Sequence, residues 1–581
     1  MPHRHKLGTV QPFSALRDAL RQRPYDLNSL RADLLAGVSV AIVAIPLAMA
    51  LAIAVGVPPQ YGLYSAIIGG LVAALAGGSR YSISGPTAAF VVVLAPIAST
   101  YGMAGLATAG LLAGGLLVAM GLARMGRLVE YVPEPVTVGF TSGIALVIAV
   151  LQLNDLLGLG VRGLPEHFLG KVASLLAALP QASWAPLLVA AITLLVKIFW
   201  PQKRLLLPGY APAIFAGTMA ALLLAWSGHP VDTIGTRFAY VIDGMSGHGI
   251  PQAMPRLALP WLLPGPEGGS FILDMATFRA LLPAAVTIAM LGAIESLLCA
   301  VVLDRSTRTR HHSNGELVGA GMANMVAPFF GGIPVTAAIA RSVVNVKAGA
   351  RTPLAAAFHA LFVLLGVLLM APLLAFVPMA AMAAVLLVVA WNMSEAHTAL
   401  LLMRRASRAD RLVLLVCFSL TVIFDMVIAI GVGMVLAAFL FMRDIARFTQ
   451  VRELDSDPVL ATTPLPEGWR VVSINGAMFF AAAERILAQL LEQSPDGSGL
   501  IIDGDGITLL DAGGVSALER FEEECEERRI RVLLSGLTAQ PARAARDARI
   551  GQKPGVLSLL PHLSIAVETA RNEETTAGKR S

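Results

Sequence analysis

The sequence predicts a polytopic α-helical membrane protein that ends in a small α/β domain. The chain of 581 residues is 56% hydrophobic and only 14% charged, with a mean hydropathy of +0.71. A soluble chain carries about a quarter charged residues. Apolar runs of membrane-spanning length follow one another as far as residue 443, and polar and apolar residues alternate beyond it.

We expect a basic cytoplasmic region at 1–32, followed by about fourteen membrane segments within a transporter-like region at 33–443. A spanning helix needs about 20 apolar residues, and two of the fourteen runs, the third and the tenth, are short for that purpose. In order, the segments are expected at 33–56, 61–78, 84–99, 104–122, 130–157, 174–200, 208–227, 278–303, 316–330, 333–348, 354–373, 376–393, 410–424 and 426–442.

The placement of basic residues orients these segments. Arginine and lysine gather in alternate loops, as the positive-inside rule expects of cytoplasmic loops. We therefore place both the N-terminus and the C-terminus in the cytoplasm. The loops expected inside carry Arg80, Arg124, Arg127, Lys203, Arg204, Arg305, Arg308, Arg310, Lys347, Arg351, Arg404, Arg405, Arg408 and Arg411.

The C-terminal region reads as a linker at 444–465, a soluble domain at 466–571 and a disordered tail at 572–581. Within the domain, strands are expected at 469–474, 499–503 and 531–535. Helices are expected between them, at 481–493 and 515–528. This alternation predicts a layered α/β domain.

The third and tenth segments open with similar motifs. Ser84-Gly85-Pro86-Thr87 begins the third, and Gly331-Gly332-Ile333-Pro334-Val335-Thr336 begins the tenth, at the same position in each half of seven. Paired interrupted segments indicate a transporter site formed by an inverted repeat. We expect two half-helices, starting near Pro86 and Pro334, whose N-terminal N–H groups share an anion. The alternative is a chance recurrence of residues common in membrane helices.

Two charged residues lie at membrane depth near these motifs. Arg341 follows the second motif, where it is expected to bind the anion, unless it reaches out to the membrane surface. Glu295 lies in the middle of the eighth segment. A carboxyl group there is costly unless protonated, paired or solvated, so we expect it to couple transport to protons. The alternative is a structural pair with Arg341.

Other functional classes lack support in the sequence. No phosphate-binding loop or hydrolase motif is present, so neither an enzyme nor ATP-driven pumping by this chain is expected. Cys299, Cys417 and Cys525 are far apart and form no metal-ligand pattern. We expect no cofactor and no metal. The basic residues follow the membrane topology and do not indicate nucleic acid.

Seven stretches of the sequence form a recognisable set of motifs. They are 33–59, Tyr61-Gly62-Leu63-Tyr64, Gly78-Ser79-Arg80, Ser84-Gly85-Pro86, Gly331-Gly332-Ile333-Pro334, Ala340-Arg341-Ser342 and Leu510-Asp511-Ala512-Gly513-Gly514. These motifs resemble the sulfate permease (SulP) family of anion transporters. The resemblance covers nearly the whole chain in family order, and residues 466–570 resemble the STAS domain that follows such transporters. The sequence at 290–299 and 389–397 is similar to bacterial C4-dicarboxylate transporters of the family.

The resemblance implies a seven-plus-seven inverted repeat with elevator-type movement of a core domain (segments 1–4 and 8–11) against a gate domain (segments 5–7 and 12–14). It also implies a multi-pass protein of the bacterial inner membrane, embedded in lipid, that forms a homodimer. Its STAS domain would bind a cytosolic protein. Glu295 matches the family's acidic coupling site. The expected substrate-binding residues are Leu51, Ser84, Gly85, Pro86, Thr87, Gly332, Pro334, Thr336, Ala340 and Arg341.

Two positions depart from the family pattern. Leu47 stands where many members have Gln, which leaves the identity of the anion open. Ala512 stands where regulatory STAS proteins carry a phosphorylated Ser, and alanine has no hydroxyl to phosphorylate.

The sequence-based hypothesis is therefore proton-coupled uptake of a C4-dicarboxylate such as succinate, fumarate or aspartate. One alternative is transport of sulfate or bicarbonate, with sodium as a second possible coupling ion. Another is a membrane-anchored sensor that signals through the STAS domain.

Overall fold

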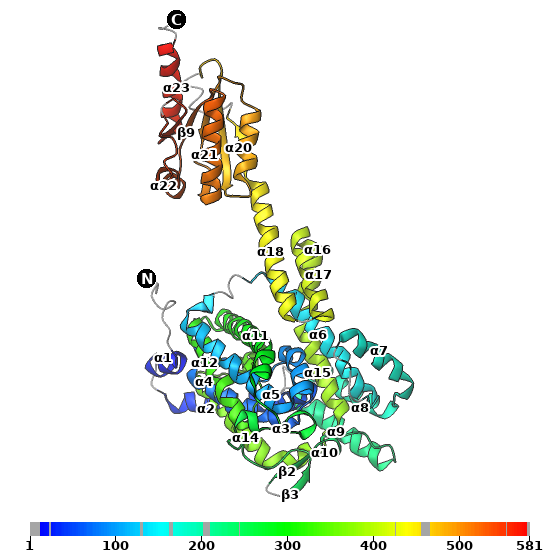
Figure 1. The fold of residues 1–581 in the computed structure, drawn as a ribbon. Coiled ribbons are helices and arrows are strands. Elements are labelled where there is room, and N and C mark those ends of the chain that lie inside the picture. The colour runs from blue at the N-terminus through cyan, green and yellow to red at the C-terminus, as the bar shows by residue number, and fades with distance from the viewer. Residues whose placement is uncertain are drawn as a thin grey trace. The chain divides into compact units, whose positions relative to one another are not determined.

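The computed structural model describes residues 12–22, 25–127, 132–161, 165, 167–201, 209–242, 245–424, 426–454, 465–553 and 555–577 (Figure 1). The chain divides into two compact units, Met1–Met434 and Val435–Ser581. The first unit is almost entirely helical, and the second contains a six-stranded sheet.

The first unit contains these described α-helices: α1 (Ser14–Gln22), α2 (Leu27–Val55), α3 (Pro59–Tyr64), α4 (Gly70–Ala76), α5 (Ala88–Leu122), α6 (Glu134–Leu157), α7 (Phe168–Ala178), α8 (Trp184–Phe199), α9 (Tyr210–Trp226), α10 (Ile234–Arg237), α11 (Met275–Thr307), α12 (Ser313–Val326), α13 (Ile339–Lys347), α14 (Leu354–Leu374), α15 (Met379–Met393), α16 (Ala396–Arg405) and α17 (Arg408–Ile423). Helix α18 (Met426–Phe448) runs across the division between the units.

Short elements join these helices. A π-helical turn, η1 (Ser65–Gly69), connects α3 to α4, and 3-10 turns occur at η3 (Leu179–Gln181), η4 (Pro260–Leu262), η5 (Pro266–Gly268) and η6 (Ala327–Phe330). Two short antiparallel strand pairs complete the unit. They are β1 (Ser84–Gly85) with β4 (Thr336–Ala337), and β2 (Ala239–Ile242) with β3 (Met245–His248).

Each of the fourteen predicted membrane segments contains a helix. Within the described residues, eight helical stretches are long and apolar enough to cross a membrane, and nine if the bent pair of α7 and α8 forms one span. The remaining predicted segments hold shorter helices, such as α9 and α13. Length and composition therefore establish a polytopic helical membrane protein without establishing fourteen crossings.

Two predicted segments, the third and fourth, are joined in α5, with a break inside it. Gly102 has φ 65° and ψ −161°, which interrupts the helix. A side chain at this position would lie 2.3 Å from the backbone of Gly265, in the long loop before α11. The Ala104 N–H also donates a hydrogen bond of 3.1 Å to the Pro264 carbonyl. Glycine therefore lets the helix break and the loop approach it closely.

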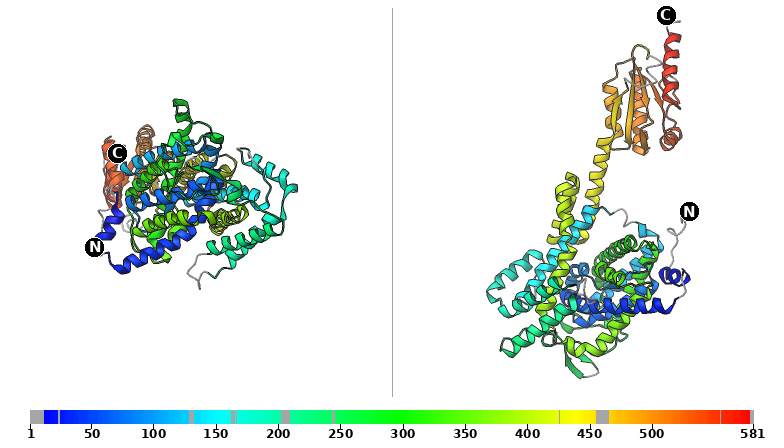
Figure 2. Two further views of the ribbon diagram at one scale, coloured as in Figure 1. Left: turned by 90° about the horizontal axis from the view of Figure 1, so that it is seen from below. Right: turned by 180° about the vertical axis from the view of Figure 1, so that it is seen from behind.

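The helices of the first unit pack in two groups. In one group α2 packs on α14, and α5 packs on α11 and α12. In the other, α6 packs on α15 and α17, and α8 packs on α9. Helices α7 to α9 form one edge of the unit, and α1 lies at the opposite edge (Figures 1 and 2). Helices of the two groups also contact each other, as α15 does α2 and α5 does α6. The division into a core and a gate domain and their relative movement stay predictions.

Small residues bring α5 and α12 close together. A Cβ atom on Gly114 would lie 2.7 Å from the Gly321 carbonyl oxygen, and one on Gly321 would lie 2.8 Å from the Gly114 oxygen. Membrane helices gain stability from such close backbone contact, because no hydrophobic driving force acts between helices in lipid.

The second unit is an α/β domain. Its strands are β5 (Gln450–Glu453), β6 (Trp469–Met478), β7 (Gly499–Asp503), β8 (Ile507–Leu510), β9 (Arg531–Ser535) and β10 (Leu557–Leu560). Its helices are α20 (Ala483–Glu492), α21 (Ala512–Glu527), α22 (Ala539–Asp547) and α23 (Leu563–Ala577). The sheet order is β10-β9-β7-β6-β5, and β8 pairs with β6. All pairings are parallel except that of β5 with β6.

Alternation along the strands gives this sheet two apolar faces. Val472 and Ile502 point into a core shared with α20 and α21. Their neighbours Val471 and Ile501 point to the other face, where they meet Ala566 and other residues of α23. Successive side chains on a strand point to opposite faces, so each strand supports helices on both sides.

The structure corrects two predicted boundaries in this region. Residues 450–453, expected in the linker, form β5, because their backbone pairs with the edge strand β6. Residues 572–577, expected in a disordered tail, continue α23, which is held by the apolar contacts of Ala566, Val567 and Ala570. Residues 455–464 and 578–581 lie outside the described residues.

The buried Cys525 gives a prediction for this unit. Its side chain is 0% exposed on the inner face of α21, and burial raises the pKa of its thiol to about 12, from 9.0. The folded state therefore holds the proton more tightly than the unfolded state, so this group stabilises the domain below pH 9 and loses that contribution as pH rises toward 12. We expect Cys525 to resist thiol alkylation at pH 8 until the domain unfolds.

The measurement is site-resolved alkylation by mass spectrometry on the intact chain, with and without denaturant. A matched control is Ser516→Cys, which places a thiol on the exposed face of the same helix and should be modified at once. Rapid alkylation of native Cys525 would contradict its burial.

Candidate functional site

The two motifs lie in extended segments that precede α5 and α13, residues 81–87 and 331–338, which we call the lead-ins. The lead-ins pair with each other as two short strands. In β1 and β4, Ser84 lies opposite Ala337 and Gly85 opposite Thr336. Beside them, the Ala338 N–H donates to the Ile83 carbonyl over 2.9 Å. Non-helical backbone inside a membrane protein needs partners for its N–H and C=O groups. Each lead-in supplies the partner that the other lacks, so the two motifs hold each other in place.

This pairing corrects the predicted starts of the half-helices. The second half-helix, α13, begins at Ile339 and not near Pro334, and the first, α5, begins at Ala88, two residues after Pro86. The reason is that residues 336–337 and 84–85 are extended as strands. The two helices therefore start directly after the strands.

Buried polar side chains form hydrogen bonds with the backbone of the lead-ins. The Asn324 amide donates to the Val335 carbonyl over 2.7 Å and accepts from the Val335 N–H over 2.8 Å. Ser65 Oγ accepts from the Ile333 N–H, and Ser342 Oγ accepts from the Ile83 N–H. These residues are not among those predicted from the sequence. Asn324, a polar residue in an apolar helix, was the available signal.

Arg341 lies between the starts of the two half-helices. It belongs to the first turn of α13 and is only 2% exposed. Its Nη2 donates to the Pro86 carbonyl over 2.7 Å, and its Nη1 is buried without a hydrogen-bond partner among the described residues. A Cβ atom on Gly85 would lie 2.6 Å from Nη1. Arg341 thus packs against the opposite lead-in and does not reach the membrane surface.

Glu295 approaches from α11. Its Oε2 accepts a 3.0 Å hydrogen bond from Thr87 Oγ1 at the start of α5. No direct ion pair joins Glu295 to Arg341 in the described part of the chain. At the next residue of α11, Ser296 Oγ lies 2.9 Å from Thr336 Oγ1. Helix α11 therefore contacts both lead-ins.

Both half-helices start without a side-chain cap. Thr87, the N-cap residue of α5, donates its hydroxyl to Glu295 and accepts no bond from the first turn. Ala338, the N-cap residue of α13, has no side-chain acceptor. The first N–H groups of a helix lack intrahelical partners and carry partial positive charge. Two such ends next to a buried arginine form a site suited to an anion.

The remaining predicted residues lie around this site. Ala340 is exposed in the first turn of α13. Leu51 is buried in the apolar core of the unit. Gly332 and Pro334 lie before β4. The Gly332 N–H donates to Ala327, and the Pro334 ring packs near Gly110 of α5. These positions give Gly332 and Pro334 a supporting place in the fold, whereas Ser84 to Thr87, Thr336, Arg341 and Glu295 come together.

Comparisons with known proteins identify the family of this chain. Residues 30–417 match the family model described as "Sulfate permease family", and residues 461–562 match the STAS domain. The chain is 36% identical over 548 residues to "Putative sulfate transporter YvdB" of Bacillus subtilis, covering 94% of this chain and 99% of the relative. It is 27% identical to "Bicarbonate transporter BicA" of Picosynechococcus, covering 94% and 98%.

A solved structure shares the fold. The murine Solute Carrier 26 family member A9 anion transporter superposes with a TM-score of 0.79 at 19% identity, covering 96% of this chain and 94% of that one. The two relatives carry the names of sulfate and bicarbonate transporters, and neither is named as the C4-dicarboxylate transporter that the sequence was expected to resemble most. The chain is a multi-pass membrane protein and a member of the sulfate permease family of anion transporters, with a C-terminal STAS domain.

Proposed function

We propose that the chain is a secondary transporter that carries sulfate together with a proton. The observation that carries this proposal is the position of Arg341, buried between two uncapped helix starts, with Nη1 unpartnered among the described residues. A buried arginine with an unpaired donor is costly. A bound anion that accepts from Nη1 and from the helix N–H groups would remove that cost.

The charges at the site favour a divalent anion with a proton. Arg341 contributes one positive charge, and each helix N-terminus contributes roughly half a charge. With Glu295 protonated, the sum is roughly +2, which matches sulfate. With Glu295 ionised, the sum is roughly +1, which matches bicarbonate. Protonation of Glu295 therefore selects the divalent anion and couples its binding to a proton.

The contact between Thr87 and Glu295 gives the coupling a structural route. The Thr87 hydroxyl donates to Glu295 Oε2 at the start of α5. Protonation of Glu295 makes its carboxyl group a weaker hydrogen-bond acceptor for Thr87. The orientation of the Thr87 hydroxyl, which lies at one wall of the anion site, therefore depends on this proton. Movement of the expected core, which comprises α2 to α5 and α11 to α14, against the other helices would then carry the anion across the membrane. This movement and a homodimeric state follow from the family resemblance.

Bicarbonate transport is the second candidate, because the chain covers 98% of its bicarbonate-transporting relative. Its discriminating feature is the charge state of Glu295, since a monovalent anion is balanced when the carboxylate is ionised. Transport of C4-dicarboxylates is retained as an outcome of the competition assay below. A sensor role for the STAS domain has no observation in its favour.

The central prediction concerns substrate and Arg341. Purified protein in proteoliposomes should take up labelled sulfate, and Arg341→Gln should weaken sulfate affinity at least about 30-fold, because a buried charge contact is lost. Arg279→Gln, which removes one charge from the exposed start of α11, is the matched control and should leave uptake unchanged. Bicarbonate and succinate are added as competitors, with and without sodium.

Stronger competition by bicarbonate, with sodium dependence, would favour the second candidate. Stronger competition by succinate would restore the dicarboxylate hypothesis. Unchanged uptake by Arg341→Gln would overturn the assignment of this residue to the anion.

A second prediction tests the close approach at Gly85. Gly85→Ala should displace the guanidinium of Arg341, because the added Cβ atom would lie 2.6 Å from Nη1. We expect sulfate uptake to fall at least about tenfold while expression is retained, since the flexible end of the arginine can move. Gly115→Ala in α5, where nothing lies within 4 Å of the new atom, should keep full activity. Equal uptake by the two variants would show that the Arg341 position is unimportant.

A third prediction tests the proton. Glu295→Gln keeps the shape of the protonated side chain and removes its titration. Sulfate exchange should persist, whereas uptake should no longer respond to an imposed pH gradient. The readout is initial uptake rate across a series of external pH values at fixed membrane potential. Retained acceleration by inward-directed protons in this variant would exclude Glu295 as the coupling group.

A further inference from the structure

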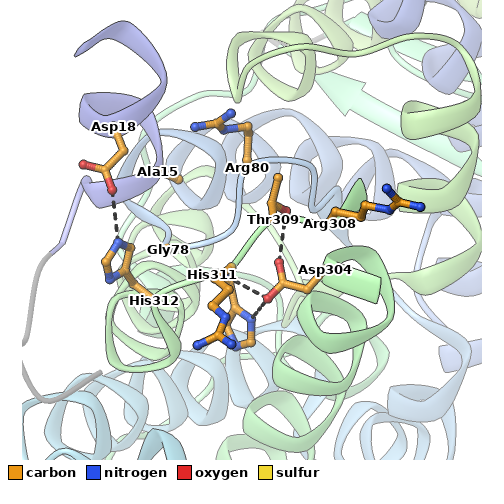
Figure 3. A pocket seen from close by; sticks show the side chains of 10 residues that line it. Ala15, Asp18, Gly78, Arg80, Asp304, Arg308, Thr309, His311 and His312 are labelled. Atoms are coloured by element: carbon orange, nitrogen blue, oxygen red, sulfur yellow. Dashed lines mark hydrogen bonds and ion pairs between the residues drawn. The ribbon is translucent and has the colours of Figure 1, made fainter. Parts of the chain in front are cut away.

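A second polar site lies away from the half-helices. A cavity of about 240 Å³ is formed by α1, the loop after α4, the end of α11 and the start of α12. Its charged lining residues are Asp18, Arg80, Asp304, Arg308, Arg310, His311 and His312. Figure 3 shows Arg80 and Arg308 on either side of Thr309. The topology expected from the basic loops places this cavity on the cytoplasmic side.

The carboxylates of the cavity are occupied by other contacts. Asp304 accepts from the His311 N–H over 2.9 Å and from Thr309 Oγ1 over 3.1 Å, and it lies 2.8 Å from His311 Nδ1 (Figure 3). Asp18 of α1 lies 3.1 Å from His312 Nε2. Asp304 therefore shapes the loop between α11 and α12, and Asp18 fastens α1 to the start of α12.

Two arginines of the cavity are left without a carboxylate. Arg308 and Arg310 are exposed, and neither forms an ion pair within the described ranges. Arg308 also adopts a left-handed backbone, with φ 56°, a conformation that is unfavourable for a residue with a side chain. The loop therefore holds two guanidinium groups without an ion-pair partner among the described residues, while the two carboxylates that line the same cavity, Asp18 and Asp304, contact histidines.

The start of α12 packs closely against the loop after α4. The buried Glu316 in the first turn of α12 accepts from the Gly78 and Ser79 N–H groups, so its carboxyl group offsets the partial positive charge of this helix start. Helix α12 begins at Ser313, and no side chain caps its first N–H groups. The Gly78 carbonyl accepts from the His312 N–H over 3.0 Å, which closes the cavity with the loop after α4. A side chain at Gly78 would lie 2.2 Å from the His312 oxygen, so only glycine fits there. Close packing of the loop after α4 against His312 therefore forms this wall of the cavity.

We propose that this cavity binds a phosphate group, presented either by an anionic lipid headgroup or by a free phosphate compound. Guanidinium groups match the geometry of phosphate oxygens, and the volume suits a small polar group. Basic clusters at the cytoplasmic surface of a membrane attract anionic lipids. The loop from Gly78 leads directly to Ser84 of β1, so a bound phosphate would steady the approach to the first half-helix.

The test uses the purified full-length chain in nanodiscs of phosphatidylcholine. Thermal unfolding is followed with added phosphatidylglycerol in one arm and with inorganic phosphate in the other, because a ligand that binds the folded state raises the unfolding temperature. Arg308→Gln with Arg310→Gln should weaken the stabilising affinity about tenfold or more. Arg404→Gln with Arg405→Gln, an equal loss of exposed charge from α16, is the matched control.

Both arms are repeated with Arg341→Gln. This variant distinguishes binding at the cavity from binding at the anion site proposed above. Stabilisation that survives in this variant and disappears in the Arg308 and Arg310 variant supports the proposal, whether or not sulfate is transported. An effect of phosphatidylglycerol alone identifies a lipid headgroup, and an effect of inorganic phosphate identifies a free compound. Absence of both effects, or equal effects in the double variant and its control, would overturn the proposal.

Discussion

The pairing of β1 with β4 is the interaction on which the rest of the membrane unit depends. Two extended segments can exist at the centre of an apolar protein only if their backbone groups are satisfied, and here each satisfies the other. Because of this pairing, α5 and α13 start close together, and Arg341 can reach the Pro86 carbonyl in the opposite half. A backbone requirement therefore produces the polar site.

The surrounding helices turn this arrangement into a charged site of limited size. Helix α11 brings Glu295 to Thr87 and Ser296 to Thr336, so one helix contacts both lead-ins. Asn324 fixes Val335 on both sides of its peptide group. Neither half-helix has a side-chain cap. The partial positive charge of their first N–H groups is therefore not neutralised by a capping side chain and is available to an anion.

The sequence allowed the main features to be predicted, but not their registers. Apolar runs identified the helices of the membrane unit. The alternation of strand and helix patterns over 469–535 identified three strands and two helices of the STAS domain. The paired Gly-Pro-Thr motifs indicated the site. The start of α13 was misplaced by five residues, because proline suggested a helix start while long-range pairing made 336–337 extended. Contacts such as that of Ser342 with Ile83 join residues far apart in the sequence, and hydrophobic periodicity holds no information about them.

The mutual dependence of the two lead-ins has a consequence for the order in which the chain can fold. Residues 84–85 lie far ahead of residues 336–337 in the sequence, yet the two strands pair with each other. While the chain is being synthesised, the backbone of the first strand has no such partner until the second strand has been made. The start of α5 therefore reaches its final surroundings only after nearly all the helices of the first unit are present.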